Sequence, residues 1–214
     1  MKKLLYITCN SKPESISASK TVGREFINAF LEINSNLEFK ELDLYQMHIP
    51  RLKHTYFDCK NGVVDSKNND SLSQDEKREI DNIIQLATEF KDADIYVIAA
   101  PMWNLMFPAP LKEYIDCIIQ NDITVKIDAD KISGLLDDKE RSMIYIQSSG
   151  GGIPWLLDGK INHGGNYLED LFKFVGIKNF HEILVDKTGY TGDKQHEAVE
   201  KAKEQARALA QKLS

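Results

Sequence analysis

The chain has 214 residues, 42% of them hydrophobic and 28% charged, which is the composition of a globular domain with one sizeable core. Its 27 basic and 33 acidic residues give a net charge of −6, so nucleic acid and anionic membranes are disfavoured as main partners, because both would be repelled. No apolar run approaches the ~18 residues that a membrane span requires, so no membrane partner is expected.

The first part of the chain predicts two strands around one helix. Residues 4–8 form a continuous apolar run, which is typical of a strand covered on both faces. Apolar residues then recur at helical spacing over residues 22–33. Residues 37–44 alternate imperfectly, which favours a strand at the edge of a sheet.

The middle of the chain contains a long stretch without a period. Residues 46–72 are rich in Lys, Asn and Asp, and a stretch of that length is usually a functional lid or a mobile insertion. Ser73 and Glu76 then match a capping box, and the apolar stripe behind them predicts a helix as far as Phe90. Residues 95–100 (IYVIAA) form the clearest buried strand.

The second half of the chain continues the alternation. Apolar spacing predicts helices over residues 110–119, 168–175 and 199–213. Between these helices, residues 142–147 and 180–185 are predicted to be strands.

Five strands that alternate with five helices predict an α/β fold, a five-stranded parallel sheet with helices on both faces. We find no internal repeat and no linker, so residues 1–214 are expected to form a single domain. Right-handed crossovers leave two strand orders open, a flavodoxin-like order 2-1-3-4-5 and a Rossmann-type order. In either order, ligands bind beyond the carboxyl ends of the strands.

The loop after the first strand, residues 9–19, contains four serines and Asn10 directly before a helix. It has neither G-x-G-x-x-G nor G-K-[ST], so dinucleotide and Walker-type phosphate loops are disfavoured. Hydroxyl groups beside the N–H groups of a helix N-terminus suit a phosphate. The alternative is that Ser17 or Ser19 only caps the helix.

Cys9 at the start of this loop raises a rival function. Low-molecular-weight tyrosine phosphatases share this type of fold and begin the same loop with a nucleophilic Cys, followed six residues later by an Arg that binds the phosphoryl group. This chain has Ser15 at that position, which excludes the phosphatase function. Cys9 is then either a reactive thiol beside a helix N-terminus or an inert, partly buried one.

The loop after the third strand is unusually apolar. Residues 101–110 contain Trp103 and Phe107 together with two methionines. These side chains would suit one wall of a flat apolar ring, with Asn104 reaching the polar edge of the ring. The alternative is a hydrophobic plug against the next helix.

The loop after the fourth strand, residues 148–153, contains three consecutive glycines. Bare backbone N–H groups approach a ligand closely there and would stabilise negative charge at the N1/C2=O edge of a reduced flavin. The alternative is a flexible glycine turn.

Four motifs together resemble those of the FMN-dependent NADH-azoreductases, members of the flavodoxin-like quinone reductase superfamily, and the resemblance runs nearly end to end. They are the first-loop serines, the segment A-A-P-M-W-N over residues 99–104 with L-K-E-Y-I-D over residues 111–116, the S-S-G-G turn at residues 148–151, and F-V-G-I at residues 174–177.

The resemblance implies bound FMN, with NADH or NADPH as electron donor and a small azo compound or quinone as acceptor. It also implies a homodimer with flavin sites at the interface and a ping-pong two-electron hydride transfer through flavin N5. No catalytic side chain is expected, because FMN carries the chemistry. The expected cofactor-binding residues are Asn10, Ser17, Ala18, Ser19, Pro101, Met102, Trp103, Asn104, Leu105, Ser148, Ser149, Gly150 and Gly151. The expected substrate-pocket residues are Phe107, Ile127, Trp155 and Phe172.

Residues 123–127 alternate like a short hairpin arm. In the family this region leans over the flavin of the partner chain, and we expect the same here. The alternative is an excursion that only buries Ile127.

Two functions of other classes stay open, a flavodoxin-type electron carrier without a small-molecule substrate of its own and a regulatory module on the same fold. The five histidines and three cysteines show no metal-ligand spacing, so no metal is expected. The odd number and wide spacing of the cysteines favour a reducing cytoplasm.

Overall fold

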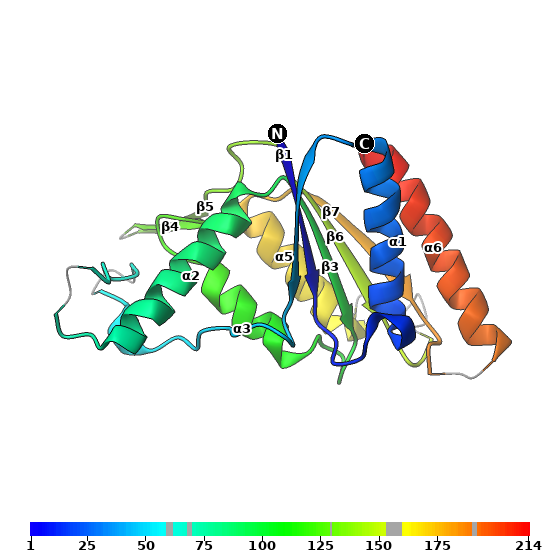
Figure 1. Ribbon diagram of the computed structural model, residues 1–214, viewed down its shortest axis with the longest axis horizontal. Coiled ribbons are helices and arrows are strands. Elements are labelled where there is room, and N and C mark those ends of the chain that lie inside the picture. Colours follow the sequence, from blue (N-terminus) through cyan, green and yellow to red (C-terminus); the bar gives the residue numbers. More distant parts are fainter. Residues whose placement is uncertain (59–61, 68–69, 129, 153–159, 190–191) are drawn as a thin grey trace.

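The computed structural model describes residues 1–58, 62–67, 70–128, 130–152, 160–189 and 192–214. Strands and helices alternate along most of the chain (Figure 1). The elements are β1 (Lys2–Thr8), η1 (Glu14–Ile16), α1 (Ala18–Ile33), β2 (Leu37–Asp43), η2 (His54–Tyr56), α2 (Gln74–Asp92), β3 (Ile95–Pro101), α3 (Ala109–Ile118), β4 (Val125–Asp128), β5 (Lys131–Gly134), β6 (Ser142–Ser148), α5 (His163–Val175), β7 (Asn179–Val185) and α6 (Asp193–Leu213).

The large sheet has five parallel strands, in the order β2-β1-β3-β6-β7. This order is 2-1-3-6-7 rather than the expected 2-1-3-4-5. The difference arises because β4 and β5 pair antiparallel with each other and form a separate two-stranded sheet. The hairpin expected near residues 123–127 is therefore confirmed, and β2 lies at the edge of the sheet as its imperfect alternation predicted.

Two apolar cores lie on opposite faces of the sheet, because successive residues of a strand point to opposite sides. Leu4 and Tyr6 belong to the core covered by α1 and α6, whereas Leu5 and Ile7 belong to the core under α2, α3 and α5. Figure 1 shows α1 and α6 side by side on one face, with α2, α3 and α5 on the other. The expectation of helices on both faces is confirmed.

The ends of two helices follow the local signals in the sequence. Ser73 and Glu76 form the capping box at the start of α2 through reciprocal hydrogen bonds. Gly176 ends α5 with a φ of 117°, a left-handed conformation that favours glycine. A Cβ at this position would also meet the backbone of Asp137 at 2.5 Å, so the close approach requires glycine as well.

The described parts of residues 46–72 are packed, which differs from the lid or mobile insertion that the missing period suggested. Ile49, Tyr56 and Leu72 are buried in the core under α2 and α3. Phe57 and Val63 form an isolated β-bridge. Isolated buried side chains hold this segment against the core. Because they do not recur at a regular spacing, the sequence shows no helical or strand pattern.

In the part of the chain that the structure describes, none of the helices combines the length and the apolar composition of a membrane-spanning helix. Cys9 and Cys117 are both free and buried.

Candidate functional site

The carboxyl ends of β1, β3, β6 and β7 meet at one edge of the sheet, and the loops that follow them surround a cavity of about 270 Å³. The three loops expected to carry chemistry therefore come together in space. The cavity is lined by Asn10, Lys12, Ile16, Ser17, Ala18, Pro101, Met102, Trp103, Ser148, Gly150, Thr188, Gly189 and Gln195.

One end of the cavity is a hydroxyl-rich seat at the start of α1. The Asn10 Nδ2 donates a hydrogen bond to Ser17 Oγ over 2.9 Å, and the hydroxyl oxygens of Ser17 and Ser19 lie 3.5 Å apart. All three side chains are buried. The first α-helical hydrogen bond runs from Thr21 N to Ser17 O, so the N–H groups of Ala18 and Ser19 precede the ladder of α1.

Ser17 also caps α1, because its Oγ accepts a hydrogen bond from the backbone N–H of Lys20. The capping alternative is therefore real. This capping hydrogen bond uses only a lone pair of the Ser17 hydroxyl oxygen. The hydroxyl hydrogen and the first N–H groups of the helix remain as donors at the positive end of α1, and such donors bind an anion.

The turn after β3 presents an apolar wall to the cavity. Trp103 and Met106 exchange backbone hydrogen bonds of 2.6 and 3.0 Å around a tight turn. At its centre Asn104 and Leu105 have φ angles of 52° and 65°, a left-handed conformation that costs a leucine about 1–2 kcal/mol. The turn leaves the side chains of Trp103 and Leu105 44% and 42% exposed at the mouth of the site.

Neighbouring elements hold this turn in place. Met102 N donates to Ser148 O over 2.7 Å, which links the loops after β3 and β6. Gly164 N at the start of α5 donates to Leu105 O over 3.2 Å, so α5 supports the strained residue directly. The ring of Tyr45 meets the ring of Trp103 edge to face, with 6.4 Å between centroids.

The glycine loop after β6 runs beside the loop after β7. Gly189 N donates to Gly150 O over 3.0 Å, and Thr188 donates to Ser149 O from both its backbone N–H and its hydroxyl. A Cβ at Gly189 would meet the Gly150 carbonyl oxygen at 2.8 Å, so this position requires glycine. The loop is therefore a paired structure rather than a free glycine turn.

A buried chain of side-chain hydrogen bonds lies behind these loops. The Tyr145 hydroxyl donates to Gln147 Oε1, and Gln147 Nε2 donates to Asn162 Oδ1, each over 2.9 Å. Asn162 Oδ1 also accepts from Gly165 N and caps α5, while its Nδ2 donates to Glu182 Oε1. Asn162 thus connects the end of β6 to the helix that supports Leu105.

Several of the lining residues were not among those expected from the sequence: Lys12, Ile16, Thr188, Gly189 and Gln195. The rule that ligands bind at the carboxyl ends of the strands applies to β7 as well, and it would have found Thr188 and Gly189. Gln195 lies in the first turn of α6, and no local pattern marks it.

Other expected residues lie outside the cavity wall. Ser19, Asn104, Leu105, Ser149 and Gly151 neighbour it without lining it in the described structure.

The expected substrate-pocket residues are not gathered at this cavity. Phe107 is buried beside Tyr167, and Ile127 on β4 packs against the larger core. Phe172 is fully buried and stacks on Phe90 with 5.6 Å between ring centroids, so the expectation of substrate contact finds no support in this chain. Trp155 lies outside the described residues.

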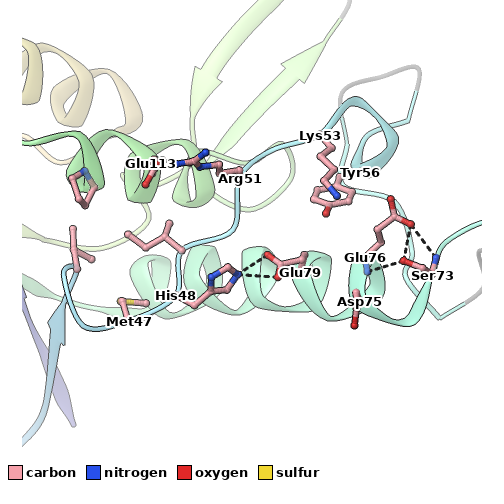
Figure 2. A pocket seen from close by; sticks show the side chains of 13 residues that line it. Met47, His48, Arg51, Lys53, Tyr56, Ser73, Asp75, Glu76, Glu79 and Glu113 are labelled. Carbon is pink, nitrogen blue, oxygen red and sulfur yellow. Dashed lines mark hydrogen bonds and ion pairs between the residues drawn. The ribbon is translucent and has the colours of Figure 1, made fainter.

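A larger cavity, of about 720 Å³, lies between residues 44–56, α2 and α3 (Figure 2). His48 pairs with Glu79 on α2, and Arg51 pairs with Glu113 on α3 over 3.1 Å. Asp75 and Glu76 also line it, and none of the expected site residues does. This excess of carboxylates repels a phosphate, so the smaller cavity is the better anion site.

Cys9 lies under the site with its side chain fully buried. Its Sγ faces the Pro108 carbonyl oxygen at 4.0 Å. Burial raises the pKa of the thiol to about 12, so it stays protonated at neutral pH. The reactive-thiol alternative therefore loses its physical basis.

Comparison with known proteins gives close matches over the whole chain. The family described as having a flavodoxin-like fold matches residues 2–210. An FMN-dependent NADH:quinone oxidoreductase of Ruminiclostridium cellulolyticum is 50% identical over 213 residues, covering 100% of both chains. Another from Clostridium botulinum (strain Alaska E43 / Type E3) is 53% identical over 203 residues, covering 94% of each.

A solved structure agrees with these relatives. The chain is similar to an FMN-dependent NADH-azoreductase from Bacillus anthracis, determined in complex with FMN, with a TM-score of 0.83 and 26% sequence identity. The similarity covers 100% of this chain and 99% of the other.

Proposed function

Because this chain belongs to the family with the flavodoxin-like fold, we propose that it is an FMN-dependent NADH:quinone oxidoreductase. One observation carries the proposal: the loops after β1, β3 and β6 converge on one cavity with a hydroxyl-rich end and an apolar wall. Relatives about half identical to this chain, with that activity in their names, give the reaction class.

The donor set of the cavity fits a flavin mononucleotide. Asn10, Ser17 and the N–H groups at the start of α1 would hold the phosphate, since each supplies a neutral donor at a positive helix end. Lys12 adds a positive charge at the same end of the cavity. No buried carboxylate lines the cavity among the described residues, so nothing there opposes a dianion.

The remaining wall fits the ring. Met102 and Trp103 provide a polarisable, flat surface against which an aromatic ring stacks. The backbone of Gly150 lies at the cavity without a Cβ, and an added Cβ there would meet nothing closer than 3.9 Å. No protein atom therefore crowds this side of the Gly150 backbone, and its N–H would be able to face the polar edge of a bound ring.

Bound FMN supplies the hydride transfer between a nicotinamide donor and a small acceptor. The residues of the chain would bind and orient FMN. The hydroxyl-rich seat at the start of α1 would hold its phosphate, and the apolar wall of Met102 and Trp103 would cover one face of its ring. We propose that donor and acceptor therefore use the remaining face in turn, which gives ping-pong kinetics. No side chain at the cavity is assigned as a general acid.

We propose quinones and azo compounds as the acceptors, because both are flat and accept two electrons. We also propose one domain over residues 1–214, a homodimer and a cytoplasmic location. The exposed side chains of Ile132 on β5 and Phe174 on α5 support the homodimer, since large apolar groups on adjoining elements are usually covered.

Steady-state kinetics test the proposed reaction. NADH oxidation is measured at several fixed concentrations of menadione, and then of an azo dye. Parallel double-reciprocal lines are expected for both acceptors. If the protein reduces neither menadione nor the azo dye but passes electrons to a redox protein that accepts them from flavodoxins, the result would favour an electron carrier instead. No NADH oxidation with any acceptor would overturn the proposal.

A further inference from the structure

The cavity of about 720 Å³ between residues 44–56, α2 and α3 is a second place where a ligand fits (Figure 2). In the described structure it shares no lining residue with the cavity proposed to hold FMN. The apolar part of its wall is formed by Leu44, Met47, Ile49, Tyr56 and Pro110. Carboxylates of α2 and α3 line the rest, so the cavity combines an apolar surface with negative charge.

The hydroxyl group of Tyr56 indicates a ligand in this cavity. Tyr56 is fully buried, and its hydroxyl has no hydrogen-bond partner among the described residues. Folded proteins pair nearly all of their buried polar groups, because an unpaired one is unfavourable. Figure 2 shows this hydroxyl directed toward α2, into the space beside Glu76 and Glu79. A polar group of a ligand in that space would be its partner.

Two carboxylates of α2 give this space its charge. Glu76 and Glu79 are three residues apart and lie on one face of the helix. Glu76 accepts hydrogen bonds from the backbone N–H and the hydroxyl of Ser73, which is neutral. Glu79 is hydrogen-bonded to His48 Nε2 over 2.8 and 3.0 Å. No lysine or arginine of the described ranges forms an ion pair with either carboxylate, so a cationic ligand would be attracted.

The chain itself shows that this space accepts an ammonium group. The Lys53 Nζ lies 5.5 Å from the centre of the Tyr56 ring, which is a cation–π contact. The hydrogen bonds from Ser73 and the charge of Lys53 lower the pKa of Glu76. Lys53 is exposed, so the ammonium group of a ligand is able to replace it over the ring.

A third carboxylate lies at the other end of the cavity. Glu113 on α3 pairs with Arg51 over 3.1 Å, and the Arg51 side chain is 85% exposed. Such an exposed pair is weak, so a second cation is able to compete for Glu113. Figure 2 shows this pair apart from Tyr56 and Glu76. A long ligand with cationic groups separated by apolar segments matches this spacing of charges along an apolar wall.

We propose that this cavity binds a linear polyamine. One ammonium group would lie over the Tyr56 ring and donate to Glu76, Glu79 and the Tyr56 hydroxyl oxygen. Another would lie near Glu113, and the methylene segments between them would cover the apolar wall. This site goes beyond the proposed function and does not depend on it, because the flavin cavity has other lining residues.

Calorimetric titration of the full-length protein with spermidine, at constant ionic strength, tests this inference. We expect saturable binding of one spermidine per chain with a Kd below about 1 mM. Absence of saturable binding up to about ten times that concentration overturns the inference. Displacement of spermidine by an equal concentration of MgCl₂ would show a metal site instead, and it overturns the inference as well.

Two substitutions on α2 locate the bound polyamine. Glu79→Gln and Glu76→Gln remove one charge each, and both are expected to raise the spermidine Kd at least ten-fold. Glutamine at position 76 still completes the capping box, so α2 keeps its start. Glu204→Gln is the matched control, because Glu204 is exposed on α6 and does not line the cavity. An equal Kd in all three variants would show diffuse attraction to the net charge of −6 and overturns the inference.

Tyr56→Phe separates binding from folding. The variant keeps the ring and loses only the hydroxyl, so the Tm of the free protein is expected to stay the same or to rise. The spermidine Kd is expected to rise about five-fold, which is the loss of one hydrogen bond. A lower Tm with an unchanged Kd would show that the hydroxyl serves the fold alone, and this result overturns the inference.

Discussion

Ser17 carries two hydrogen-bonding roles at once, since it caps α1 and is proposed to bind the flavin phosphate. Removal of the Ser17 hydroxyl distinguishes the two roles, because one affects the stability of the fold and the other affects the binding of the phosphate. Loss of the cap costs about 1 kcal/mol of folding stability. Loss of a hydrogen bond to a charged phosphate costs about 1.5–3 kcal/mol of binding.

Ser17→Ala is therefore expected to raise the Kd for FMN at least ten-fold, which is about 1.4 kcal/mol. The Kd for riboflavin, which has no phosphate, is expected to stay within two-fold. Fluorescence titrations measure both. Ser11→Ala is the control, because Ser11 is exposed and lies outside the cavity wall. Equal weakening of FMN and riboflavin would show that Ser17 does not contact the phosphate.

Cys9 gives a prediction on reactivity. Because its pKa is raised to about 12 by burial, the folded protein holds a thiol at pH 8. Iodoacetamide at pH 8 is therefore expected to leave Cys9 unmodified in the native protein and to modify it in guanidinium, as measured by peptide mass mapping. Rapid modification in the native state would contradict the buried, protonated thiol.

The same pKa shift links stability to pH. The unfolded thiol loses its proton near pH 8.5, whereas the folded thiol keeps its proton up to about pH 12. The folded state binds more protons in that interval. Proton binding by Cys9 therefore contributes to the free energy of unfolding. This contribution is complete below pH 8.5 and is lost as the pH rises toward 12.

At the scale of elements, the cap of α5 connects two loops of the site. Asn162 accepts from Gln147 Nε2 and Gly165 N, and α5 in turn donates from Gly164 N to Leu105 O. Asn162 is thus a positioning residue, which acts on the cavity through α5 and β6. It is not among the residues that line the cavity.

Asn162→Ala leaves the buried amide of Gln147 without its partner, which costs about 1–3 kcal/mol of stability. We also expect kcat/KM for the quinone to fall about ten-fold at a temperature where the variant is folded, because the turn at Leu105 loses its support. Asn162→Asp keeps the acceptor for Gly165 N but places a second carboxylate against Glu182, so the conservative variant is Asn162→Asp combined with Glu182→Gln, which is expected to restore most of kcat/KM. Loss of stability with unchanged kcat/KM would reduce Asn162 to a purely structural cap.

The β4–β5 hairpin is a second element with an assigned task. Gly134 lies against the backbone of Val175, so the hairpin packs on the end of α5. Ile132 on β5 and Phe174 on α5 are both more than half exposed. Two large apolar side chains on these adjoining elements suit an interface with a second copy of the chain.

Ile132→Lys is therefore expected to raise the dissociation constant of the proposed homodimer at least ten-fold. Light scattering during gel filtration would show a shift from two copies of the 24.4 kDa chain toward one at micromolar concentration. Ile33→Lys is the control, because Ile33 is similarly exposed on α1, on the other face of the sheet. An unchanged mass for Ile132→Lys would exclude the hairpin from the interface.

At the scale of the whole molecule, the sequence predicts what local patterns determine. The apolar run at residues 95–100 forms a central strand, in which every residue is buried. Gly176 ends α5 because the backbone there has the left-handed conformation that favours glycine. The three expected loops meet because parallel strands end at one edge of the sheet.

Long-range contacts determine the rest. The alternation over residues 123–127 predicted one arm of the hairpin, but the second strand, β5, has only four residues and no period, so its pairing with β4 could not be predicted from the sequence. Gln195 reaches the cavity only because α6 packs beside α1. Phe172 shows the same limit, since an apolar helical face does not reveal whether it covers a core or a ligand.

The most direct measurement is an absorbance spectrum of the purified full-length protein, followed by anaerobic titration with NADH. We predict flavin bands in the purified protein or after addition of FMN. These bands should bleach with about one equivalent of NADH per flavin and return when menadione is added. Absence of flavin bands together with no binding of added FMN would contradict the central claim that the hydroxyl-rich seat and the apolar wall hold a flavin nucleotide.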